Sequence, residues 1–309
     1  MTSDEQLHCA SCGQPIASGD AFCESCGARV AESGHDRRAH SEIDIDGVAG
    51  VTDKGHVHDR NEDAFFVSAP HGRAVVVVCD GVSSSSDAHH AAQTAADVAG
   101  RALVSALEQC TESAIRNGGW DPRGAISTAI TAAQSAVARI AAPERLNVEP
   151  SSCTLVAGLW DGETIAVGWI GDSRAYWVDA VGAECLTVDD SWAQLQLDAG
   201  LMTARTAAAD PRAHMITGWL GKDAPSRAPR VSSFQPARRG HLILCSDGLW
   251  NYAAGPDELA SMAPLDSGAS PLSLAQAFTR AALAAGGHDN VTVAVLDTGS
   301  LPDPALEEQ

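Results

Sequence analysis

Basic residues are scarce in this sequence of 309 residues. Twenty Lys and Arg stand against 40 Asp and Glu, which gives a formal net charge of −20. A surface of that sign repels phosphodiester backbones and anionic membranes, so binding to nucleic acid is not expected. No apolar stretch approaches the roughly 20 residues needed to cross a bilayer. The start, MTSDEQLHCA, lacks the basic and apolar regions of a signal peptide, and we therefore expect a cytoplasmic protein.

The composition is also not that of a disordered chain, because 45% of the residues are hydrophobic and 19% are charged. The nine cysteines do not indicate disulfides. Four cluster within the first 26 residues at metal-site spacing, and the other five are scattered through apolar or mixed sequence. The scattered five are Cys79, Cys110, Cys153, Cys185 and Cys245. We predict that these are reduced, mostly buried thiols.

Residues 1–30 contain two Cys-x-x-Cys pairs, each followed by Gly. The pairs are Cys9 with Cys12 and Cys23 with Cys26. Two thiolates at this spacing can chelate one tetrahedral ion, so the four predict a closed, structural Zn²⁺ site; chance pairs or a redox role are the alternatives. The segment resembles the short zinc ribbons at the ends of many bacterial proteins, which bind nucleic acid or protein. Four acids and one base in residues 1–30 favour a protein partner or a purely structural role.

The chain divides into four parts. After the ribbon, residues 31–44 have no apolar period and indicate a linker. One long domain is expected over residues 45–297, and the polar residues 298–309 are expected to form a flexible tail.

Within the long domain, apolar runs and Ala-rich stretches predict a mixed α+β fold with hairpins, not the strict alternation of a doubly wound sheet. Strands are predicted at 65–67, 74–79, 154–159, 164–170, 175–178, 241–245 and 291–296. Helices are predicted at 88–108, 123–140, 192–200 and 272–285. The Asp161-Gly162 pair between two apolar runs is typical of a hairpin turn.

Acidic residues recur at the ends of these predicted strands. Asp80-Gly81 follows four valines and a cysteine, and Glu62-Asp63 precedes an apolar run. The same pattern occurs at Asp172, Asp247 and Asp289. One such Asp is usually a turn former, but several gathered at one edge repel one another unless a cation neutralises them. Carboxylate oxygens without a His or Cys cluster favour Mg²⁺ or Mn²⁺, and two such ions can activate a water for attack on a phosphoryl group.

Five stretches, in this order, resemble the motif series of the metal-dependent type 2C protein serine/threonine phosphatases. They are TDKGHVHDRNEDAFF, VVCDGV, GWIGDSRAYWV, LILCSDGLWN and GGHDNVTVAVL. The resemblance covers about residues 47–297. The stretch that begins LTVDDSWAQLQLDAGLMT at Leu186 is similar to the flap over the site in the bacterial branch of the family.

The resemblance implies a four-layer α-β-β-α sandwich, in which two mainly antiparallel sheets are flanked by helices, here preceded by the zinc ribbon. The metal site would lie at one end, in the cleft between the sheets. The implied reaction is hydrolysis of phosphoserine and phosphothreonine monoesters in proteins by a metal-activated water. Phosphorylated proteins would be the substrates, and a Ser/Thr kinase of the same pathway is a candidate partner by analogy.

The resemblance also implies the ligands of two Mn²⁺ or Mg²⁺ ions. Asp80 would bridge both ions, and the backbone carbonyl of Gly81 would bind the second. Asp247 and Asp289 would complete the shell of the first ion. Asp172 would help to bind a third, weaker ion.

Four further residues have implied roles. Glu62 and Asp63 would act mainly through metal-bound waters. Asn290 and Arg174 would fix loops by hydrogen bonds and pairing.

The sequence departs from the family pattern where phosphate is bound. The phosphate-gripping Arg of the family lies four residues before Glu62, and here that residue is His58. Either His58 makes a weaker contact, or Arg60 reaches the phosphate, which we favour, or neither grips it. A purely structural Arg60 would instead pair with Glu62 or Asp63.

Two other departures affect the leaving group and the third ion. Some members carry a proton-donating His two residues after the bridging Asp, where this chain has Val82. His89 and His90 lie nearby but are expected at a solvated helix start. Asn251 replaces a metal-binding Asp of some members, which predicts weak binding of a third ion.

Two other functions compete with an active phosphatase. The departures suggest a phosphatase-fold regulatory or binding module with impaired catalysis, although three retained acids argue against it. Ser83–Ser86 after the Asp80 strand superficially suggest a serine hydrolase. The sequence has no Gly-x-Ser-x-Gly elbow around them, which argues against that interpretation.

Overall fold

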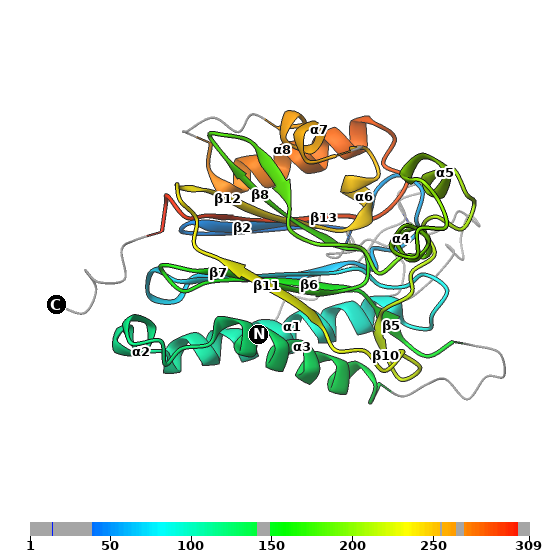
Figure 1. The fold of residues 1–309 in the computed structure, drawn as a ribbon. Helices are drawn as coiled ribbons and strands as arrows, with labels where there is room; N and C mark the ends of the chain where they lie inside the picture. The colour runs from blue at the N-terminus through cyan, green and yellow to red at the C-terminus, as the bar shows by residue number, and fades with distance from the viewer. Residues whose placement is uncertain (1–13, 15–38, 141–148, 254, 264–268, 302–309) are drawn as a thin grey trace.

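The computed structural model describes residues 14, 39–140, 149–253, 255–263 and 269–301. Two antiparallel sheets are stacked face to face in it, with helices on both outer sides (Figure 1). One sheet has six strands in the order β1-β2-β13-β12-β8-β9, and the other has five in the order β11-β7-β6-β4-β3. A short two-stranded pair, β10 and β5, lies beside them. This arrangement confirms the predicted α+β sandwich of two antiparallel sheets with helices.

The strands of the six-stranded sheet are β1 (His40–Ile45), β2 (Val48–Asp53), β8 (Arg174–Asp179), β9 (Ala183–Cys185), β12 (Gly240–Cys245) and β13 (Val291–Asp297). Those of the five-stranded sheet are β3 (Ala64–Ser68), β4 (Ala74–Cys79), β6 (Leu155–Trp160), β7 (Ile165–Ile170) and β11 (Arg230–Phe234). The small pair consists of β5 (Ser152–Cys153) and β10 (Leu220–Gly221).

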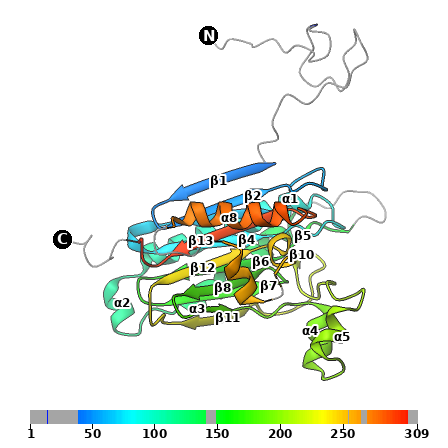
Figure 2. The same cartoon turned by 90° about the horizontal axis from the view of Figure 1, so that it is seen from above.

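Helices cover both outer faces of the stacked sheets (Figures 1 and 2). Helices α1 (Ala88–Gln109) and α3 (Pro122–Val137) pack on the five-stranded sheet, and α8 (Pro271–Ala284) packs on the six-stranded sheet. The shorter helices are α2 (Glu112–Arg116), α4 (Trp192–Asp198), α5 (Ala204–Ala208), α6 (Asp247–Trp250), α7 (Pro256–Ser261) and the 3₁₀ turn η1 (Pro70–Gly72). In the part of the chain that is described, no helix is long and apolar enough to cross a membrane.

Strand β4 shows why an unbroken apolar run forms the centre of this fold. Val75 and Val77 pack against α1 and α3, whereas Val76 and Val78 pack against the other sheet. Successive side chains of a strand point to opposite faces, so a strand covered on both sides must be apolar at every position. All six residues of β4 are buried, as its composition predicts.

The acidic residues at the strand ends all lie at one end of the sandwich. In the five-stranded sheet Ala64, which follows Asp63, pairs with Cys79, which precedes Asp80. In the six-stranded sheet Cys245 pairs with both Val293 and Arg174, and these strands adjoin Asp247, Asp289 and Asp172. Antiparallel order therefore brings strand starts and strand ends from distant parts of the sequence to one edge.

The domain is longer at both ends than the sequence suggested. The expected linker 31–44 overlaps β1, which begins at His40 and pairs with β2 throughout. Five of the six residues of β1 are exposed, and its two apolar side chains, Ile43 and Ile45, are too few to predict a strand. At the other end, Thr298 donates its backbone N–H to Gly240 and Leu301 packs against the core between the sheets. Residues 298–301 thus belong to the domain, not to the expected tail.

Several predictions concern parts of the chain outside the described residues. The four ribbon cysteines, residues 31–38 and residues 302–309 all lie there. The structural zinc, the ribbon and the remainder of the flexible tail therefore stay predictions from the sequence.

Candidate active site

The end of the sandwich described above gathers five carboxylates, here called the acid cluster. Its members are Asp63, Asp80, Asp172, Asp247 and Asp289. They come from the start of β3, the end of β4, the turn before β8, the first turn of α6 and the turn before β13. The structure thus brings together every aspartate that the sequence placed in the metal site.

Burial and mutual repulsion disfavour the charged forms of these acids. Burial, followed by the charges of neighbouring aspartates, raises the pKa of Asp80 and Asp172 well above the usual range. The same causes raise the pKa of Asp63 to about 7 and that of Asp247 to about 6. Carboxylates in such surroundings either keep protons or require a cation. This chemistry fits a hard divalent ion with oxygen ligands.

The side chains do not yet form a closed cage around an ion. Among the described residues, no three His, Cys, Asp or Glu side chains are arranged to hold a metal as they stand. After burial, the charges of Asp63 and Asp247 raise the pKa of Asp80, so these carboxylates lie close together. A divalent ion would neutralise these carboxylates, so the donor set fits a metal.

A set of hydroxyl groups positions Asp63 through hydrogen bonds. Ser246 Oγ donates to Asp63 Oδ2 at 2.8 Å and accepts from the backbone N–H of Thr292 at 3.0 Å. Thr292 Oγ1 lies 2.6 Å from Thr52 Oγ1, which also accepts from Asn61 Nδ2 at 2.8 Å. The sequence interpretation missed this buried layer of hydroxyls. The only sequence signal was Ser246 directly before Asp247.

A second hydroxyl pair supports the backbone of Asp80. Thr154 Oγ1 accepts from the Asp80 N–H at 3.2 Å and lies 2.7 Å from Ser173 Oγ. The Thr154 N–H donates to the Asp80 carbonyl at 2.8 Å. Because Ser173 follows Asp172, the loops that carry Asp80 and Asp172 are held against each other.

Asn290 ties together the loops that carry the other acids. Its Oδ1 accepts from the Glu62 N–H at 2.7 Å, and its Nδ2 donates to the carbonyls of Lys54 at 2.8 Å and Arg60 at 3.1 Å. Asn290 is buried, and it follows Asp289 directly. It therefore positions both the Glu62-Asp63 loop and the Asp289 loop, which confirms its predicted structural role.

The two candidate phosphate-binding residues have different neighbours. His58 Nε2 lies 3.2 Å from Asp289 Oδ1, within the acid cluster. Arg60 is exposed, and its Nη1 lies 3.4 Å from His89 Nδ1 at the start of α1. In this conformation His58 is the closer of the two to the acids. His89 and His90 are at the start of a helix, as predicted.

Gly81 has a steric reason to lack a side chain. A Cβ there would lie 2.7 Å from the Glu62 carbonyl oxygen and 2.8 Å from the backbone of Ala88. Such distances are too short for any side chain, so only glycine allows the three segments to meet. The Gly81 carbonyl, which the sequence predicts as a ligand of the second ion, therefore lies where these three segments meet.

The tandem serines hold a loop in place. Ser84 Oγ donates to Glu149 Oε2 at 2.8 Å, and Ser86 Oγ lies 3.4 Å from Ser151 Oγ. The Ser152 N–H donates to Ser85 Oγ at 3.2 Å, and the Val82 N–H donates to the Ser152 carbonyl at 3.0 Å. These contacts join the loop after Asp80 to the residues before β5. They give no support to a serine hydrolase.

Arg174 and Asn251 lie next to the acid cluster. Arg174 forms a two-pronged ion pair with Asp189, at 2.9 and 2.7 Å, and its guanidinium lies 3.7 Å from the ring centre of Trp250. This pairing confirms its predicted structural role. Asn251 Nδ2 donates to Asp247 Oδ2 at 3.3 Å. Asn251 therefore contacts the acid cluster as a neutral donor.

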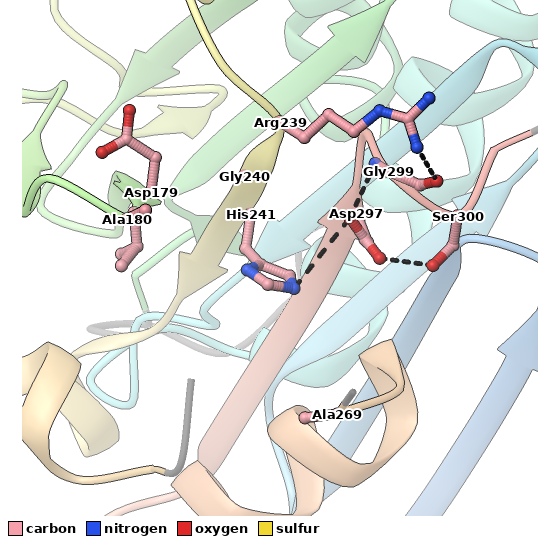
Figure 3. Close-up of a pocket in the computed structure, with 10 residues that line it drawn as sticks. Asp179, Ala180, Arg239, Gly240, His241, Ala269, Asp297, Gly299 and Ser300 are labelled. Carbon is pink, nitrogen blue, oxygen red and sulfur yellow. Dashed lines mark hydrogen bonds and ion pairs between the residues drawn. The ribbon is translucent and has the colours of Figure 1, made fainter. Parts of the chain in front are cut away.

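Two hollows of similar size lie at different ends of the sandwich. One of about 440 Å³ adjoins the acid cluster and is lined by Asp63, Asn61 and Phe65 among others. The other, of about 400 Å³, lies at the opposite strand ends (Figure 3). There Asp297 accepts from the Gly299 N–H at 2.7 Å and from Ser300 Oγ, and so closes the turn after β13. The second hollow is thus remote from the acids.

Comparison with known structures identifies the class of the fold. The crystal structure of the Mycobacterium tuberculosis serine/threonine phosphatase PstP/Ppp superposes with a TM-score of 0.63 at 26% identity, over 81% of this chain and 97% of that one. The catalytic domain of PstP in complex with two manganese ions superposes with a TM-score of 0.60 at 25% identity, over 81% and 96% of the two chains. The sandwich with acids at one end is thus the fold of bacterial serine/threonine phosphatases.

Sequence comparison identifies the family. The profile of the family described as "Protein phosphatase 2C" matches residues 53–279, and this chain belongs to that family. The full PstP of M. tuberculosis is 28% identical over 250 residues, which are 81% of this chain and 44% of PstP. The chain thus spans less than half the length of this relative.

Proposed function

We propose that this protein hydrolyses phosphoserine and phosphothreonine monoesters in phosphorylated proteins at a centre of two Mn²⁺ or Mg²⁺ ions. The observation that carries the proposal is the acid cluster at one end of a type 2C sandwich, where burial raises the pKa of four aspartates. Membership of the family supports the same reaction. The manganese-bound structure of PstP supports the choice of ions.

The resemblance to the family supports the following ligands for the ions. Asp80 would bridge the two ions, with the Gly81 carbonyl on the second and Asp247 and Asp289 on the first. Asp172 would contribute to a weaker third ion. When bound, the ions activate a water for attack on phosphorus and neutralise charge on the phosphoryl group.

The other side chains have positioning roles in this proposal. Glu62 and Asp63 orient water around the ions. Ser246 keeps its hydrogen bond to Asp63, which favours the ionised form of that acid in a buried place. Asn290 keeps the two acidic loops at a fixed separation.

His58 and Arg60 are the candidates for binding the substrate phosphate. Contact with Asp289 supports His58, whose imidazole can donate to a phosphate oxygen when protonated. The exposure and permanent charge of Arg60 support the alternative. Comparison of the two alanine variants distinguishes these candidates, because only loss of the gripping residue should raise KM.

A catalytically impaired regulatory or binding module is the second candidate. The observations that favour it are Val82, which cannot donate a proton to the leaving group, and Asn251, which contacts Asp247 without charge. Against it stands the cost of burying unneutralised carboxylates, which a module without metal has no reason to keep.

The decisive experiment measures phosphate release from p-nitrophenyl phosphate and from a phosphothreonine peptide. Activity should require Mn²⁺ or Mg²⁺, disappear with EDTA and fall at least ~100-fold in Asp80→Ala and Asp247→Ala, as expected when a metal centre loses a ligand. Calorimetry with Mn²⁺ distinguishes the two candidates. Absence of Mn²⁺ binding would favour the impaired module, and unchanged turnover in both variants would reject the proposed centre.

We further propose that residues 1–30 bind one structural Zn²⁺ through Cys9, Cys12, Cys23 and Cys26 and serve to bind a protein partner. We also propose a cytoplasmic location and a Ser/Thr kinase of the same pathway as a partner. Deletion of residues 1–30 should then lower activity on the protein substrate and leave turnover of p-nitrophenyl phosphate unchanged. Zinc content of the intact protein, measured by atomic absorption, tests the metal directly.

A further inference from the structure

A buried carboxylate beside the acid cluster holds two arginines at once. Asp190 is 1% exposed, and its Oδ1 accepts from Arg227 Nη1. Arg230 Nη2 lies 3.0 Å from the same oxygen. The other oxygen of Asp190 accepts from the Gly171 N–H at 3.1 Å. Both oxygens of this carboxylate therefore accept hydrogen bonds, which fix its orientation.

This arrangement lies at the catalytic end of the five-stranded sheet. Gly171 directly precedes Asp172, and it exchanges a second bond with Asp190, whose N–H donates to the Gly171 carbonyl at 2.8 Å. Arg230 begins β11 and pairs with Trp169 of β7. Arg230 therefore lies at the catalytic end of the five-stranded sheet, and Arg227 reaches Asp190 from the residues before β11. Asp190 itself lies in the flap segment, residues 186–221.

The two arginines leave a surplus of positive charge. One carboxylate neutralises one guanidinium, and the part of the chain that is described shows no second carboxylate within 4.0 Å of either arginine. Their side chains remain 32% and 34% exposed. A guanidinium has five N–H donors, and each arginine directs only one group at Asp190. Donors thus remain for a further acceptor on the solvent side.

The surroundings offer room for that acceptor. A hollow of about 240 Å³ is bounded by Arg227, Ser226, Trp219 and Gln134. Arg230 does not line this hollow but shares the Asp190 oxygen with Arg227. On a protein of net charge −20, a fixed surplus of positive charge is an exception to the general repulsion of anions. Because the two arginines lie near the acid cluster, the anion that they would contact is the substrate.

We propose that Arg227 and Arg230 form an accessory oxyanion site, which binds an acidic or phosphorylated residue flanking the phosphoresidue under attack. The site deepens the proposed phosphatase function and rests on it. Guanidinium groups bind carboxylates and phosphates by charge-assisted, often two-pronged hydrogen bonds, which fits both kinds of flanking residue. The site would select acidic or multiply phosphorylated segments over neutral ones.

The test uses single variants, because removal of one arginine still leaves Asp190 neutralised by the other. Arg227→Ala and Arg230→Ala are compared with Arg212→Ala in the full chain. Arg212 lies within the flap segment, residues 186–221, whereas Arg227 and Arg230 follow it, and Arg212 pairs one-to-one with Asp210 at 2.9 and 3.0 Å. All three variants change the net charge equally, and Arg212→Ala additionally removes the contact of Arg212 with the Trp192 ring, at 4.0 Å. Melting curves confirm that each variant is folded.

The substrates are three phosphothreonine peptides of equal length and p-nitrophenyl phosphate. One peptide has neutral flanks, one has flanking Asp and Glu, and one has a second phosphoserine. Loss of one charge-assisted contact should raise KM for the two anionic peptides by about 5- to 10-fold in Arg227→Ala and Arg230→Ala. Values of kcat, the neutral peptide and p-nitrophenyl phosphate should stay unchanged, and Arg212→Ala should resemble the unmodified protein.

Other outcomes overturn the proposal. Equal effects on neutral and anionic peptides, no effect at all, or an equal effect of Arg212→Ala would remove the accessory site. Weaker inhibition by free inorganic phosphate without any change for peptides would assign the arginines to a free ion instead of a substrate segment. Failure of the unmodified protein to hydrolyse p-nitrophenyl phosphate with Mn²⁺ would reject the phosphatase proposal itself, which is a distinct result.

Discussion

His58 Nε2 lies 3.2 Å from Oδ1 of Asp289, so an imidazole touches one of the acids proposed to bind metal. The family pattern places an arginine at position 58, and an arginine grips phosphate with two parallel N–H groups where histidine offers one at a time. This contact places position 58, where the sequence departs from the family pattern, beside the acid cluster.

Exchange of His58 for arginine should improve binding of the substrate phosphate. We expect His58→Arg to lower KM for a phosphothreonine peptide several-fold, because a permanent charge and a two-pronged donor replace an imidazole. His58→Ala should raise KM, and Arg60→Ala serves as the comparison. If KM rises in Arg60→Ala and not in His58→Ala, the phosphate is bound by Arg60.

Loss of the Ser246 hydroxyl, which donates to Asp63, should weaken the binding of metal. Ser246→Ala removes the 2.8 Å hydrogen bond to Asp63 and leaves that half-buried carboxylate with fewer donors. We expect a loss of about 1–3 kcal/mol in the free energy of unfolding. The Mn²⁺ dissociation constant, measured by calorimetry, should rise together with it. Ser84→Ala removes a hydroxyl bonded to Glu149 in an exposed loop and should alter neither quantity.

Removal of metal should make stability depend on pH in a defined direction. The pKa of Asp63 is raised to about 7 and that of Asp247 to about 6, both from a usual value of 3.8. The metal-free native state therefore binds protons more tightly than the unfolded chain, and its stability falls as pH rises from about 4 to about 7. Saturating Mn²⁺ should suppress this decline, because the ion takes the place of the protons.

Melting temperatures of the EDTA-treated protein at pH 5 and pH 7.5 measure this effect. We expect the higher pH to give the lower value by several degrees, after comparison with the manganese-loaded protein at the same two pH values. The variant Asp63→Asn carries no titrating group at that position and should show a smaller difference. A metal-free protein that is more stable at pH 7.5 would contradict the raised pKa values.

Gly248 should not tolerate any side chain. A Cβ at this position would lie 1.9 Å from the carbonyl oxygen of Asn290, which belongs to the loop that follows Asp289. Gly248→Ala should therefore displace the first turn of α6, which carries Asp247, and abolish most of the activity along with several kcal/mol of stability. Gly255→Ala is the matched control, since no atom lies within 4 Å of a Cβ there. Thermal unfolding and turnover of p-nitrophenyl phosphate measure both effects.

The parts of the fold that could be predicted are those in which the residues of a single segment indicate its structure. The valines of β4 and the apolar residues of β12 specify buried strands because every position packs against a neighbouring layer. Aspartates at the strand ends were predicted to converge, and the antiparallel order does bring them together. A pattern of this kind is local, so it can be read without knowledge of the tertiary contacts.

Other features could not be predicted because they depend on contacts between distant segments. Thr52 and Thr292 are 240 positions apart, and nothing in their own surroundings indicates that they form a hydroxyl layer under Asp63. The edge strand β1 is exposed at five of six positions and has only two apolar side chains, Ile43 and Ile45. Asp190 and the neighbouring pair Arg227 and Arg230 likewise come from separate segments, and their relation appears only when both arginines contact one oxygen of Asp190.

The position at which β1 begins has a consequence for the proposed zinc ribbon. His40 pairs with Asp53, and Asp53 pairs with Val291, two residues beyond Asp289. The Lys54 N–H donates to the Ala39 carbonyl at 2.7 Å, so the chain enters the domain at the rim of the acid cluster. A protein held by the preceding segment would be tethered there, and its phosphorylated residues would experience a raised effective concentration at the site. Such a tether would accelerate turnover of one partner without improving any contact in the active site.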